Sequence, residues 1–327
     1  MSWRMRLTGR RLCLLVASIA SVADEIPAWL GSWCEDYLGA GLQACQLQSS
    51  HMSSVFAARL VDGRQVAVKV RADEDGRAVA CVAAQLRLAA GGFPCAAPLT
   101  PVLVVEGMAV HAEEWRPGGV MMRGDAPGVA RRFAELLGWL MRDLSRVTVP
   151  PPLPNPYWLR WDHGGPGPWP AMDFLDERDQ SLIPGFVVET VSRATRRLAR
   201  AELPGVLGHA DFETQNIRWL GDEPLAVHDW DSLAWMPEAV IVGAASGAFA
   251  SAETPTLAPV ESSAEFLFAY QQRTGRPFTR EETEVAWAAS LWPAAHNARA
   301  EALFRQPPVA GAPLQSQARE RLARAGA

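Results

Sequence analysis

Apolar and polar residues alternate along the first third of the chain in a way that predicts β-strands. Residues 55–61 and 65–70 are rich in valine and other small apolar side chains, and they flank the dipeptide Asp62-Gly63. Asp-Gly between two such runs is a strong signal for a β-hairpin. Two further strands are predicted at 101–105 and 108–112.

Two helices accompany these strands, at 27–38 and 78–90. Two glycines and Pro94 follow the second helix and are expected to end it. Residues 113–119 then break the pattern and predict a connector, whereas the polar run 49–54 predicts a loop before the first hairpin. The N-terminal part is therefore expected to be a small β-rich lobe.

After the connector the periodicity becomes helical. Apolar residues recur every three or four positions from 129 to 144, which indicates a strongly amphipathic helix. Another helix is predicted from about 186 to about 201. Segments 150–156 and 162–170 are dense in proline and glycine and are expected to be loops.

Three helices are expected to close the chain. One begins at Thr279, because Glu282 follows three residues later and completes a capping box. Pro293 is expected to kink that helix. The overall pattern predicts an α+β fold with a β-rich N-terminal lobe and a larger, mostly helical C-terminal lobe.

Composition narrows the class of protein. The chain has 327 residues, 49% of them hydrophobic and 20% charged, which suits a folded protein with a sizeable core and excludes a disordered one. The net charge of -5 supplies no basic excess for nucleic acid, so none is expected as a partner. A cationic or neutral substrate is compatible with this charge.

The cysteines and the N-terminus bear on the compartment. Five cysteines without any C-x-x-C pair are expected to be reduced thiols in a cytoplasmic protein. Arginines precede an apolar run at 12–23, a pattern similar to a signal peptide, but the run is too short to span a bilayer. A helix packed on the first lobe, or an over-long start of the reading frame, is the preferred interpretation, and no membrane partner is expected.

A second hairpin predicts a polar site. Strands at 217–220 and 225–228 enclose a turn at 221–224, so Asn216 and Asp229 are expected to face each other across the open end. Opposed side chains of this kind are about 5 Å apart at Cβ.

Asp211 lies five residues before Asn216, beside the same hairpin end. A carboxylate there could accept the proton of an attacking hydroxyl, which makes Asp211 the candidate catalytic base. Asn216 and Asp229 offer the hard oxygen ligands that Mg²⁺ prefers. His209 is expected to brace the loop. Asp231 could approach the metal or the substrate, or cap a following helix, and the capping role is preferred.

Lys69 is the candidate contact for nucleotide phosphates. Period-two alternation places it on one face of its strand together with Ala67, which leaves room for a flat base. Ser53 belongs to the polar run before the hairpin, whose hydroxyls and backbone N–H groups could also cover phosphates. An exposed strand lysine and a plain polar loop are the alternatives.

Candidate acceptor-binding residues lie further along the chain. Trp161 is in a proline- and glycine-rich loop and could stack on a sugar ring, although core packing is the commoner fate of tryptophan. His296 and Asn297 belong to a polar run on a helix otherwise rich in alanine and tryptophan. Such a run could line a pocket or form a buried structural network.

These residues, in this order, resemble the aminoglycoside phosphotransferase family, small-molecule kinases with a protein-kinase-like fold. The family pattern of His, any residue, Asp, four residues and Asn matches residues 209–216. Its later Asp-Trp-acidic triplet matches 229–231, and its strand lysine matches Lys69. The resemblance spans roughly 40–300. It implies ATP and Mg²⁺ as cofactors and a small-molecule hydroxyl as acceptor.

The resemblance also implies roles for the parts of the chain. It divides the chain into an N-terminal extension (1–24), a nucleotide-binding N-lobe (25–112), a hinge (113–119) and a catalytic, acceptor-binding C-lobe (120–327). Backbone groups of the hinge would meet the adenine, which assigns cofactor binding to three consecutive residues, Glu113, Glu114 and Trp115.

Three departures from the family pattern stand out. Ala210 replaces the usual glycine, the phosphate loop has no glycine, and the helix glutamate that should pair with Lys69 is missing. Alignment with the family pattern puts Cys81 in its place, and Gln85 is a polar residue on the same predicted helix. A nucleotide-binding regulatory protein without catalysis is therefore the alternative function. A metal phosphohydrolase, suggested by His228 beside Asp229, is less favoured.

Overall fold

The structure is a computed structural model that describes residues 28–50, 53–105, 107–122, 124, 127–161, 163, 165, 167–251 and 256–327. The expected extension at 1–24 and Cys13 lie outside these ranges. The four cysteines within them are free thiols. Among the described residues, none of the helices combines the length and the apolar character needed to cross a bilayer.

The chain divides into two compact units. The first comprises the chain up to Pro117 together with Val149–Leu153, and the second comprises Gly118–Thr148 and Pro154–Ala327. The division therefore falls inside the expected connector at 113–119. The return of Val149–Leu153 to the first unit was not predicted, because a short proline-rich segment carries no pattern that identifies its packing partner.

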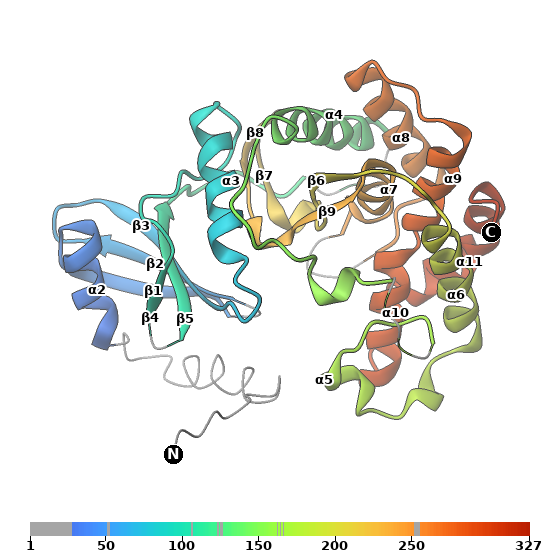
Figure 1. The fold of residues 1–327 in the computed structure, drawn as a ribbon, viewed down its shortest axis with the longest axis horizontal. Coiled ribbons are helices and arrows are strands. Elements are labelled where there is room, and N and C mark those ends of the chain that lie inside the picture. The colour runs from blue at the N-terminus through green and yellow to red at the C-terminus, as the bar shows by residue number, and fades with distance from the viewer. Residues whose placement is uncertain are drawn as a thin grey trace. The chain divides into compact units, whose positions relative to one another are not determined.

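The first unit contains one antiparallel sheet in the order β1-β2-β3-β5-β4 (Figure 1). Its elements are α2 (Ala28–Leu38), β1 (Leu42–Ser50), β2 (Ser53–Leu60), β3 (Gln65–Ala72), α3 (Ala78–Ala90), β4 (Leu103–Val105) and β5 (Met108–Glu114). The predicted strands and both predicted helices are present. Strand β1 was not predicted, because its three glutamines interrupt the apolar pattern.

Two segments predicted to be irregular are strands. Ser53 begins β2 and pairs with Arg71 of β3, so the expected loop at 49–54 contributes the ends of β1 and β2. The expected connector begins too early, because β5 continues through Glu113 to Glu114, which pairs with Val66. Strand β5 extends beyond its apolar residues because it pairs along its length with the central strand β3.

The core of the first unit lies on one face of this sheet. Helix α2 contributes Leu30, Trp33 and Cys34, and the strands contribute alternating residues such as Val68 and Val110. All five are almost completely buried. Burying an apolar side chain of the size of leucine or valine stabilises the fold by about 1.5–3 kcal/mol, so these contacts hold α2 against the sheet.

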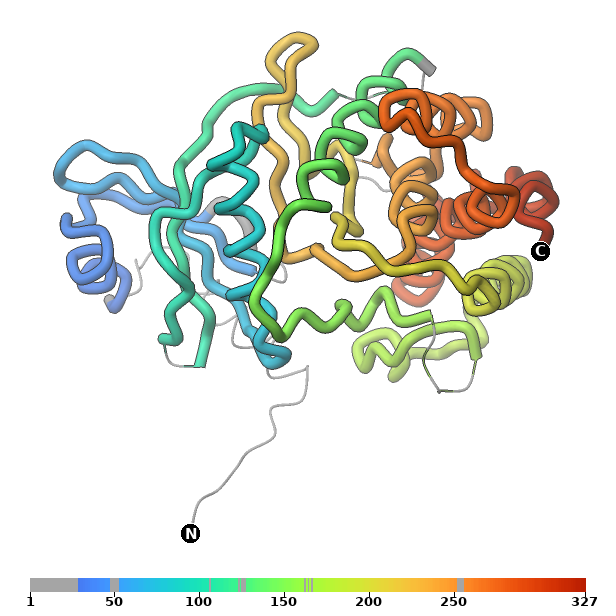
Figure 2. Tube along the Cα trace, turned by 45° about the horizontal axis from the view of Figure 1, so that its top comes forward, coloured from blue at the N-terminus to red at the C-terminus, as the bar shows by residue number. Residues whose placement is uncertain are grey.

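The second unit combines helices with two small antiparallel sheets, β6-β9 and β7-β8, which can be followed along the trace in Figure 2. Its strands are β6 (Gly205–His209), β7 (Ile217–Leu220), β8 (Glu223–Val227) and β9 (Leu233–Pro237). Its helices are α4 (Pro127–Leu144), α5 (Asp173–Asp176), α6 (Gly185–Ala199), α7 (Glu238–Ala248), α8 (Val260–Thr274), α9 (Arg280–Ala289), α10 (Trp292–Phe304) and α11 (Gly311–Arg324).

Two predictions about the C-terminal helices were wrong. Five helices, α7 to α11, follow the hairpin in the described part of the chain, where three were expected. Pro293 does not kink a helix; it lies in the first turn of α10, where its missing N–H has no intrahelical partner to lose. The predicted capping box of Thr279 and Glu282 is present at the start of α9.

Small residues allow α7 and α9 to pack at backbone distance. A Cβ added at Gly243 would lie 2.2 Å from the carbonyl oxygen of Ala286. A Cβ at Gly247 would lie 2.1 Å from the carbonyl oxygen of Ser290. The four-residue spacing on both helices places these contacts on one face of each.

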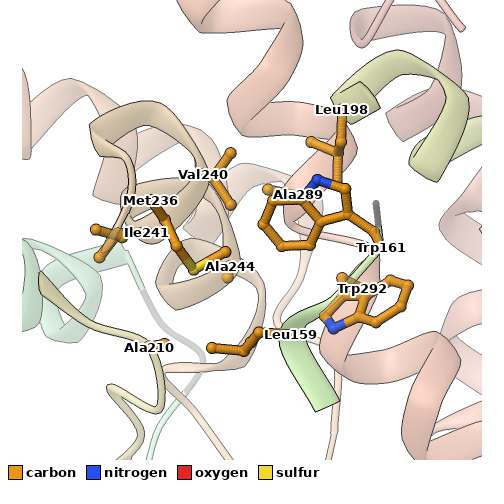
Figure 3. A pocket seen from close by; sticks show the side chains of 10 residues that line it. All are labelled: Leu159, Trp161, Leu198, Ala210, Met236, Val240, Ile241, Ala244, Ala289 and Trp292. Atoms are coloured by element: carbon orange, nitrogen blue, oxygen red, sulfur yellow. The ribbon is translucent and has the colours of Figure 1, made fainter. Parts of the chain in front are cut away.

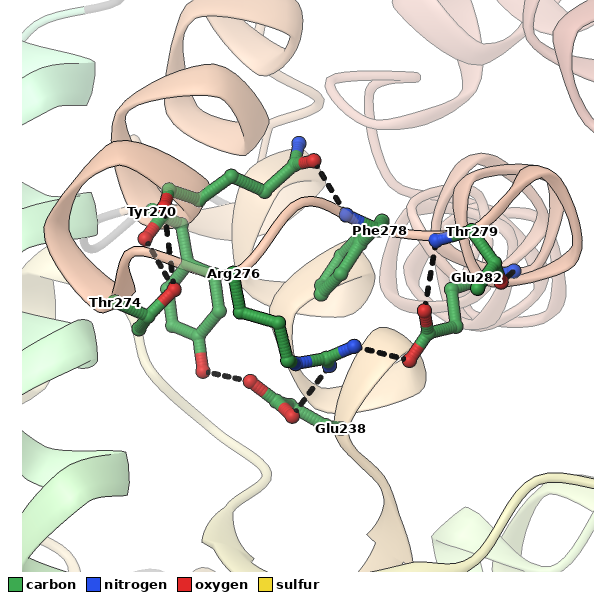
Figure 4. A network of polar contacts seen from close by, with 8 residues as sticks. Glu238, Tyr270, Thr274, Arg276, Phe278, Thr279 and Glu282 are labelled. Carbon is green, nitrogen blue, oxygen red and sulfur yellow. Dashed lines mark hydrogen bonds and ion pairs between the residues drawn. The ribbon is translucent and has the colours of Figure 1, made fainter.

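A polar network joins three of these helices at their ends (Figure 4). Glu238, at the start of α7, accepts hydrogen bonds from the Tyr270 hydroxyl at 2.6 Å and from Arg276 at 2.7 Å. Arg276 also donates to Glu282 at 2.8 Å, and Glu282 is part of the α9 capping box. The network ties together the ends of the three helices that follow the β7-β8 hairpin in the chain.

Candidate functional site

The hairpin β7-β8 differs from its predicted register by one residue. Ile217 pairs with Val227, and the backbone N–H of His228 donates to the carbonyl of Asn216 at 2.8 Å. Asn216 therefore lies opposite His228. The prediction that it would lie opposite Asp229 was wrong by one residue. The turn is shorter than predicted, and a bulge at Leu225 shifts the return strand.

Asp229, the second residue after β8, has an unusual backbone conformation. Its φ of 60° and ψ of 50° place it in the left-handed region, which aspartate tolerates better than most residues. The Ser232 hydroxyl donates to Asp229 Oδ2 at 2.6 Å, and the Ser232 N–H donates to the Asp229 carbonyl at 3.0 Å. The aspartate is thus held at a sharp turn immediately after β8.

Asp211 lies on the loop between β6 and the short 3-10 turn Thr214–Asn216. Asn216 donates from Nδ2 to Asp211 Oδ2 at 2.8 Å and to the Asp211 carbonyl at 2.9 Å. Burial, followed by the charge of Asp229 and its contact with Asp211, raises the pKa of Asp211 to about 7, although the Asn216 bond opposes the rise. The three predicted residues therefore converge.

His209 is completely buried at the end of β6. Its Nδ1 accepts the Asp211 N–H at 3.3 Å, and its Nε2 lies 3.0 Å from the His228 carbonyl oxygen. This pattern requires a neutral ring that donates from Nε2, and burial lowers the pKa of His209 in agreement. The imidazole links the loop of Asp211 to the strand end before Asp229.

Glu213 was not predicted as part of this site. It is almost fully buried, and Gln215 donates to its carboxylate at 2.7 Å. Burial and the charge of Asp211 raise its pKa. The sequence contains one signal for it: Glu213 is a second acidic residue only two positions after Asp211, and its neighbours are phenylalanine and threonine.

The side-chain oxygen atoms near Asp211 are suitable ligands for a divalent cation. Asn216 donates through Nδ2, so its amide oxygen remains as a ligand, and Asp229 has Oδ1 beyond the Ser232 bond. Two facing carboxylates repel each other unless a proton or a cation lies near them. No group of three His, Cys, Asp or Glu side chains in the described ranges has a metal-site arrangement, so a cation here would also need waters or phosphate oxygens.

In the first unit, Lys69 is part of a buried polar cluster. Its Nζ lies 2.9 Å from Glu113 Oε1. Gln85 of α3 donates to Glu113 Oε2 at 2.8 Å. The missing helix glutamate thus has a counterpart on β5.

The other expected nucleotide contacts stay predictions. The N–H of Glu114 donates to the Ala97 carbonyl at 2.9 Å, and its carboxylate pairs with Arg116, so adenine would need other groups of the segment. Trp115 follows the end of β5 directly, and Ser53 begins β2.

Trp161 is half-buried and packs edge-on against Trp292, with ring centroids 6.1 Å apart. Both tryptophans line a small apolar cavity, and Ala210, the neighbour of Asp211, lines it as well (Figure 3). The cavity measures about 10 Å³, room for one water molecule at most. A second hollow is lined by Asp211, Glu213 and Ala210 together with Pro293.

The remaining expected acceptor residues lie at different places in the second unit. His296 and Asn297 are partly buried on α10, and burial and the charge of Arg299 lower the pKa of His296 to about 4. Asp231 lies in the 3-10 turn Trp230–Ser232. The following element is the strand β9, so the alternative in which Asp231 caps a helix was wrong.

Comparisons with known proteins identify a family from the sequence and a fold from the structure. A sequence profile described as the phosphotransferase enzyme family, APH, matches residues 44–275. Comparison with curated proteins found no match.

Among solved structures, the amicoumacin kinase hAmiN, in complex with AMP-PNP, Ca²⁺ and Ami, is similar with a TM-score of 0.60 and 12% identity, over 95% of this chain and 93% of that one. The spectinomycin phosphotransferase APH(9)-Ia, in complex with ADP and spectinomycin, has a TM-score of 0.56 and 11% identity, over 90% and 99%.

A ternary complex of a thermostable mutant of the aminoglycoside phosphotransferase APH(4)-Ia with AMP-PNP and hygromycin B has a TM-score of 0.54 and 15% identity, over 91% and 99%. Identities this low show a shared fold, which is kinase-like and α+β, as predicted. Since the family profile covers well over half of the sequence, this chain belongs to the phosphotransferase enzyme family.

Proposed function

We propose that this protein transfers the γ-phosphoryl group of ATP to a hydroxyl of a small molecule, such as an aminoglycoside, a sugar or a related metabolite. The observation that carries the proposal is the convergence of Asp211, Asn216 and Asp229 at the ends of β6 and β8. The first unit would contribute nucleotide contacts, and the second would contribute catalysis and acceptor binding.

Asp211 would be the catalytic base. Its carboxylate would orient the acceptor hydroxyl and take up its proton as the oxygen attacks the γ-phosphorus and the bond to the β-phosphate oxygen breaks. The raised pKa of Asp211 near 7 makes it an adequate proton acceptor once it is ionised. Asn216 holds one carboxylate oxygen, which leaves Oδ1 to face the hydroxyl.

Asn216 and Asp229 would hold Mg²⁺ through one amide and one carboxylate oxygen. The bound ion would neutralise phosphate charge during transfer. Ser232 fixes the second oxygen of Asp229, and His209 fixes the spacing between the loop of Asp211 and the strand end. These neighbours pre-organise the ligands, and their own contacts do not compete for the remaining oxygens.

The acceptor would bind near the two hollows that share Ala210. Pro293 of α10 lines the hollow that contains Asp211, so His296 and Asn297, one turn further along the same helix, are candidate acceptor contacts. Trp161 and Asp231 are further candidates. The apolar cavity behind Ala210 would have to widen to admit any part of an acceptor.

A regulatory protein that binds nucleotide without catalysis is the competing function. It was favoured by the missing helix glutamate, but Lys69 is paired with Glu113 instead. A metal phosphohydrolase would need imidazole ligands, whereas both ring nitrogens of His209 are engaged by backbone groups.

An ATP-consumption screen over hydroxyl-bearing metabolites and antibiotics tests the proposal. The wild-type protein is expected to consume ATP with at least one acceptor in the presence of Mg²⁺, and Asp211→Ala serves as the blank. ATP binding without turnover on any acceptor would support the regulatory alternative. The absence of both binding and turnover would contradict both functions.

A further inference from the structure

We infer that Glu113 of β5 replaces the missing helix glutamate as the residue that positions Lys69, and that Gln85 of α3 in turn positions Glu113. The inference rests on the proposed function, because it assumes that Lys69 contacts nucleotide phosphates. It concerns positioning residues, since neither Glu113 nor Gln85 would touch the reacting atoms.

Strand pairing brings Lys69 and Glu113 to the same face. In the register of β3 and β5, Ala67 pairs with Glu113 and Lys69 pairs with His111. Paired residues of an antiparallel sheet project to one side, so a lysine and a glutamate two positions apart lie on a diagonal within reach of each other. The ion-pair distance is 2.9 Å, with the side chains 13% and 4% exposed.

Gln85 holds the other carboxylate oxygen. Its Nε2 donates to Glu113 Oε2 at 2.8 Å and to the Ala96 carbonyl at 2.8 Å, and the side chain is almost fully buried. Both amide hydrogens are thereby used, which leaves the glutamine one orientation. Helix α3 thus contributes a donor to the carboxylate, where the family pattern has the carboxylate itself.

No side chain of α3 can replace Glu113 as the partner of Lys69. The helix contains no aspartate or glutamate, and Cys81, which aligns with the family's glutamate, is fully buried with its pKa raised by that burial. Glu114, the neighbouring acid, pairs with Arg116. Asp73 accepts the N–H of Ala78 at the start of α3.

The charge state of the cluster agrees with this role. Burial opposes ionisation of Glu113, but Lys69, the imidazole of His111 with its Nε2 3.9 Å from Glu113 Oε2, and the hydrogen bond from Gln85 together outweigh it and lower the pKa of Glu113. His111 is buried, which lowers its own pKa and keeps it neutral near pH 7. Glu113 is therefore the negative charge that holds the ammonium of Lys69 in place.

A double-mutant cycle on the full-length protein tests the inference. Glu113→Gln should raise the KM for ATP by roughly 10- to 100-fold, the effect of losing a charge-assisted hydrogen bond, and leave the KM for the acceptor unchanged. Lys69→Met should have a similar effect. If Glu113 acts through Lys69, adding Glu113→Gln to Lys69→Met should cause no further loss.

Two further variants keep the result interpretable. Asp62→Asn removes a carboxylate from an exposed ion pair with Arg64 in the turn between β2 and β3, and it should leave both KM values unchanged. Gln85→Met should raise the KM for ATP less than Glu113→Gln does, and it is the test variant if Glu113→Gln fails to fold.

The outcomes separate the inference from the function on which it rests. The positioning role would be overturned if Glu113→Gln kept the wild-type KM for ATP, or if the effects of Glu113→Gln and Lys69→Met on that KM were fully additive. In either case, ATP turnover by the unaltered protein would still support the proposed function. If the unaltered protein neither binds nor turns over ATP, the proposed function fails, and the inference fails with it.

Discussion

Asn216 donates a hydrogen bond from Nδ2 to Asp211 Oδ2 at 2.8 Å, within a loop where the same amide nitrogen also meets the Asp211 carbonyl at 2.9 Å. The pair of bonds fixes which end of the amide faces the aspartate. The amide oxygen is consequently directed away from Asp211 and is available to a cation. One side chain thus orients the proposed base and offers a metal ligand.

Replacing Asn216 should therefore impair two functions at once. We expect Asn216→Ala to lower turnover by about 100-fold or more, because an ordered carboxylate and a cation ligand are both lost. The Mg²⁺ concentration that gives half-maximal turnover should also rise. A drop in turnover with an unchanged Mg²⁺ requirement would remove Asn216 from the metal site.

The raised pKa of Asp211 predicts a pH-dependent response to Mg²⁺. Without the ion, the folded protein holds a proton on Asp211 up to about pH 7, whereas the unfolded chain releases it near 3.8, so this contribution to stability is lost as the pH rises towards 7. Mg²⁺ competes with that proton. The increase in Tm on adding Mg²⁺ should be larger at about pH 8 than at about pH 6.

Asp211→Asn provides the control for this experiment, because its amide has no proton to release in this range. The Mg²⁺-induced change in Tm should then depend much less on pH. An equal Mg²⁺ effect at both pH values in the wild-type protein would contradict the proposed link between Asp211 and the ion.

The close contact between α7 and α9 predicts an effect of a single methyl group on the stability of the protein. Gly243→Ala would place a methyl group 2.2 Å from the Ala286 carbonyl oxygen, so the helices must separate. We expect a loss of about 1–3 kcal/mol in the free energy of unfolding, measured by urea denaturation. Gly31→Ala is the matched control: its Cβ meets nothing within 4 Å in α2, and a gain of about 0.5–1 kcal/mol is expected.

The polar network of α7, α8 and α9 offers a second comparison of stability. Arg276 joins Glu238 to Glu282, and its side chain is only half-exposed. Arg276→Ala should lower the free energy of unfolding by about 1 kcal/mol, whereas Arg280→Ala, whose side chain is 93% exposed beside Glu284, should change it by less than about 0.5 kcal/mol. If both variants lost the same free energy of unfolding, the ion pairs of Arg276 with Glu238 and Glu282 would contribute nothing beyond an exposed surface pair.

Local signals predicted most of the regular elements. The Asp62-Gly63 turn, the period-two strands and the amphipathic helix at 129–144 all appear within a few residues of their expected limits. Strand β1 was missed because three glutamines interrupt its apolar pattern. Such polar residues are compatible with its position at the edge of the sheet, which the sequence does not show. Strand β5 was cut short because pairing with β3, a tertiary interaction, carried it through two glutamates.

The sequence predicted that Asp211, Asn216 and Asp229 would lie close together, but it did not predict the local geometry that brings them together. Spacing alone grouped Asp211, Asn216 and Asp229, yet it could not foresee the bulge at Leu225 or the left-handed backbone of Asp229. The partner of Lys69 was sought on the wrong element. A glutamate on an adjacent strand becomes a partner only through sheet register, which the sequence of one strand does not contain.

Asp211→Asn tests the central claim most directly. The measurement combines calorimetric binding of ATP in the presence of Mg²⁺ with ATP turnover on an acceptor identified with the wild-type protein. The account predicts that the variant binds ATP with Mg²⁺ nearly as well as the wild type, because the amide replaces a carboxylate of similar shape, while turnover falls by at least about 100-fold. Turnover by Asp211→Asn at the wild-type rate would contradict it.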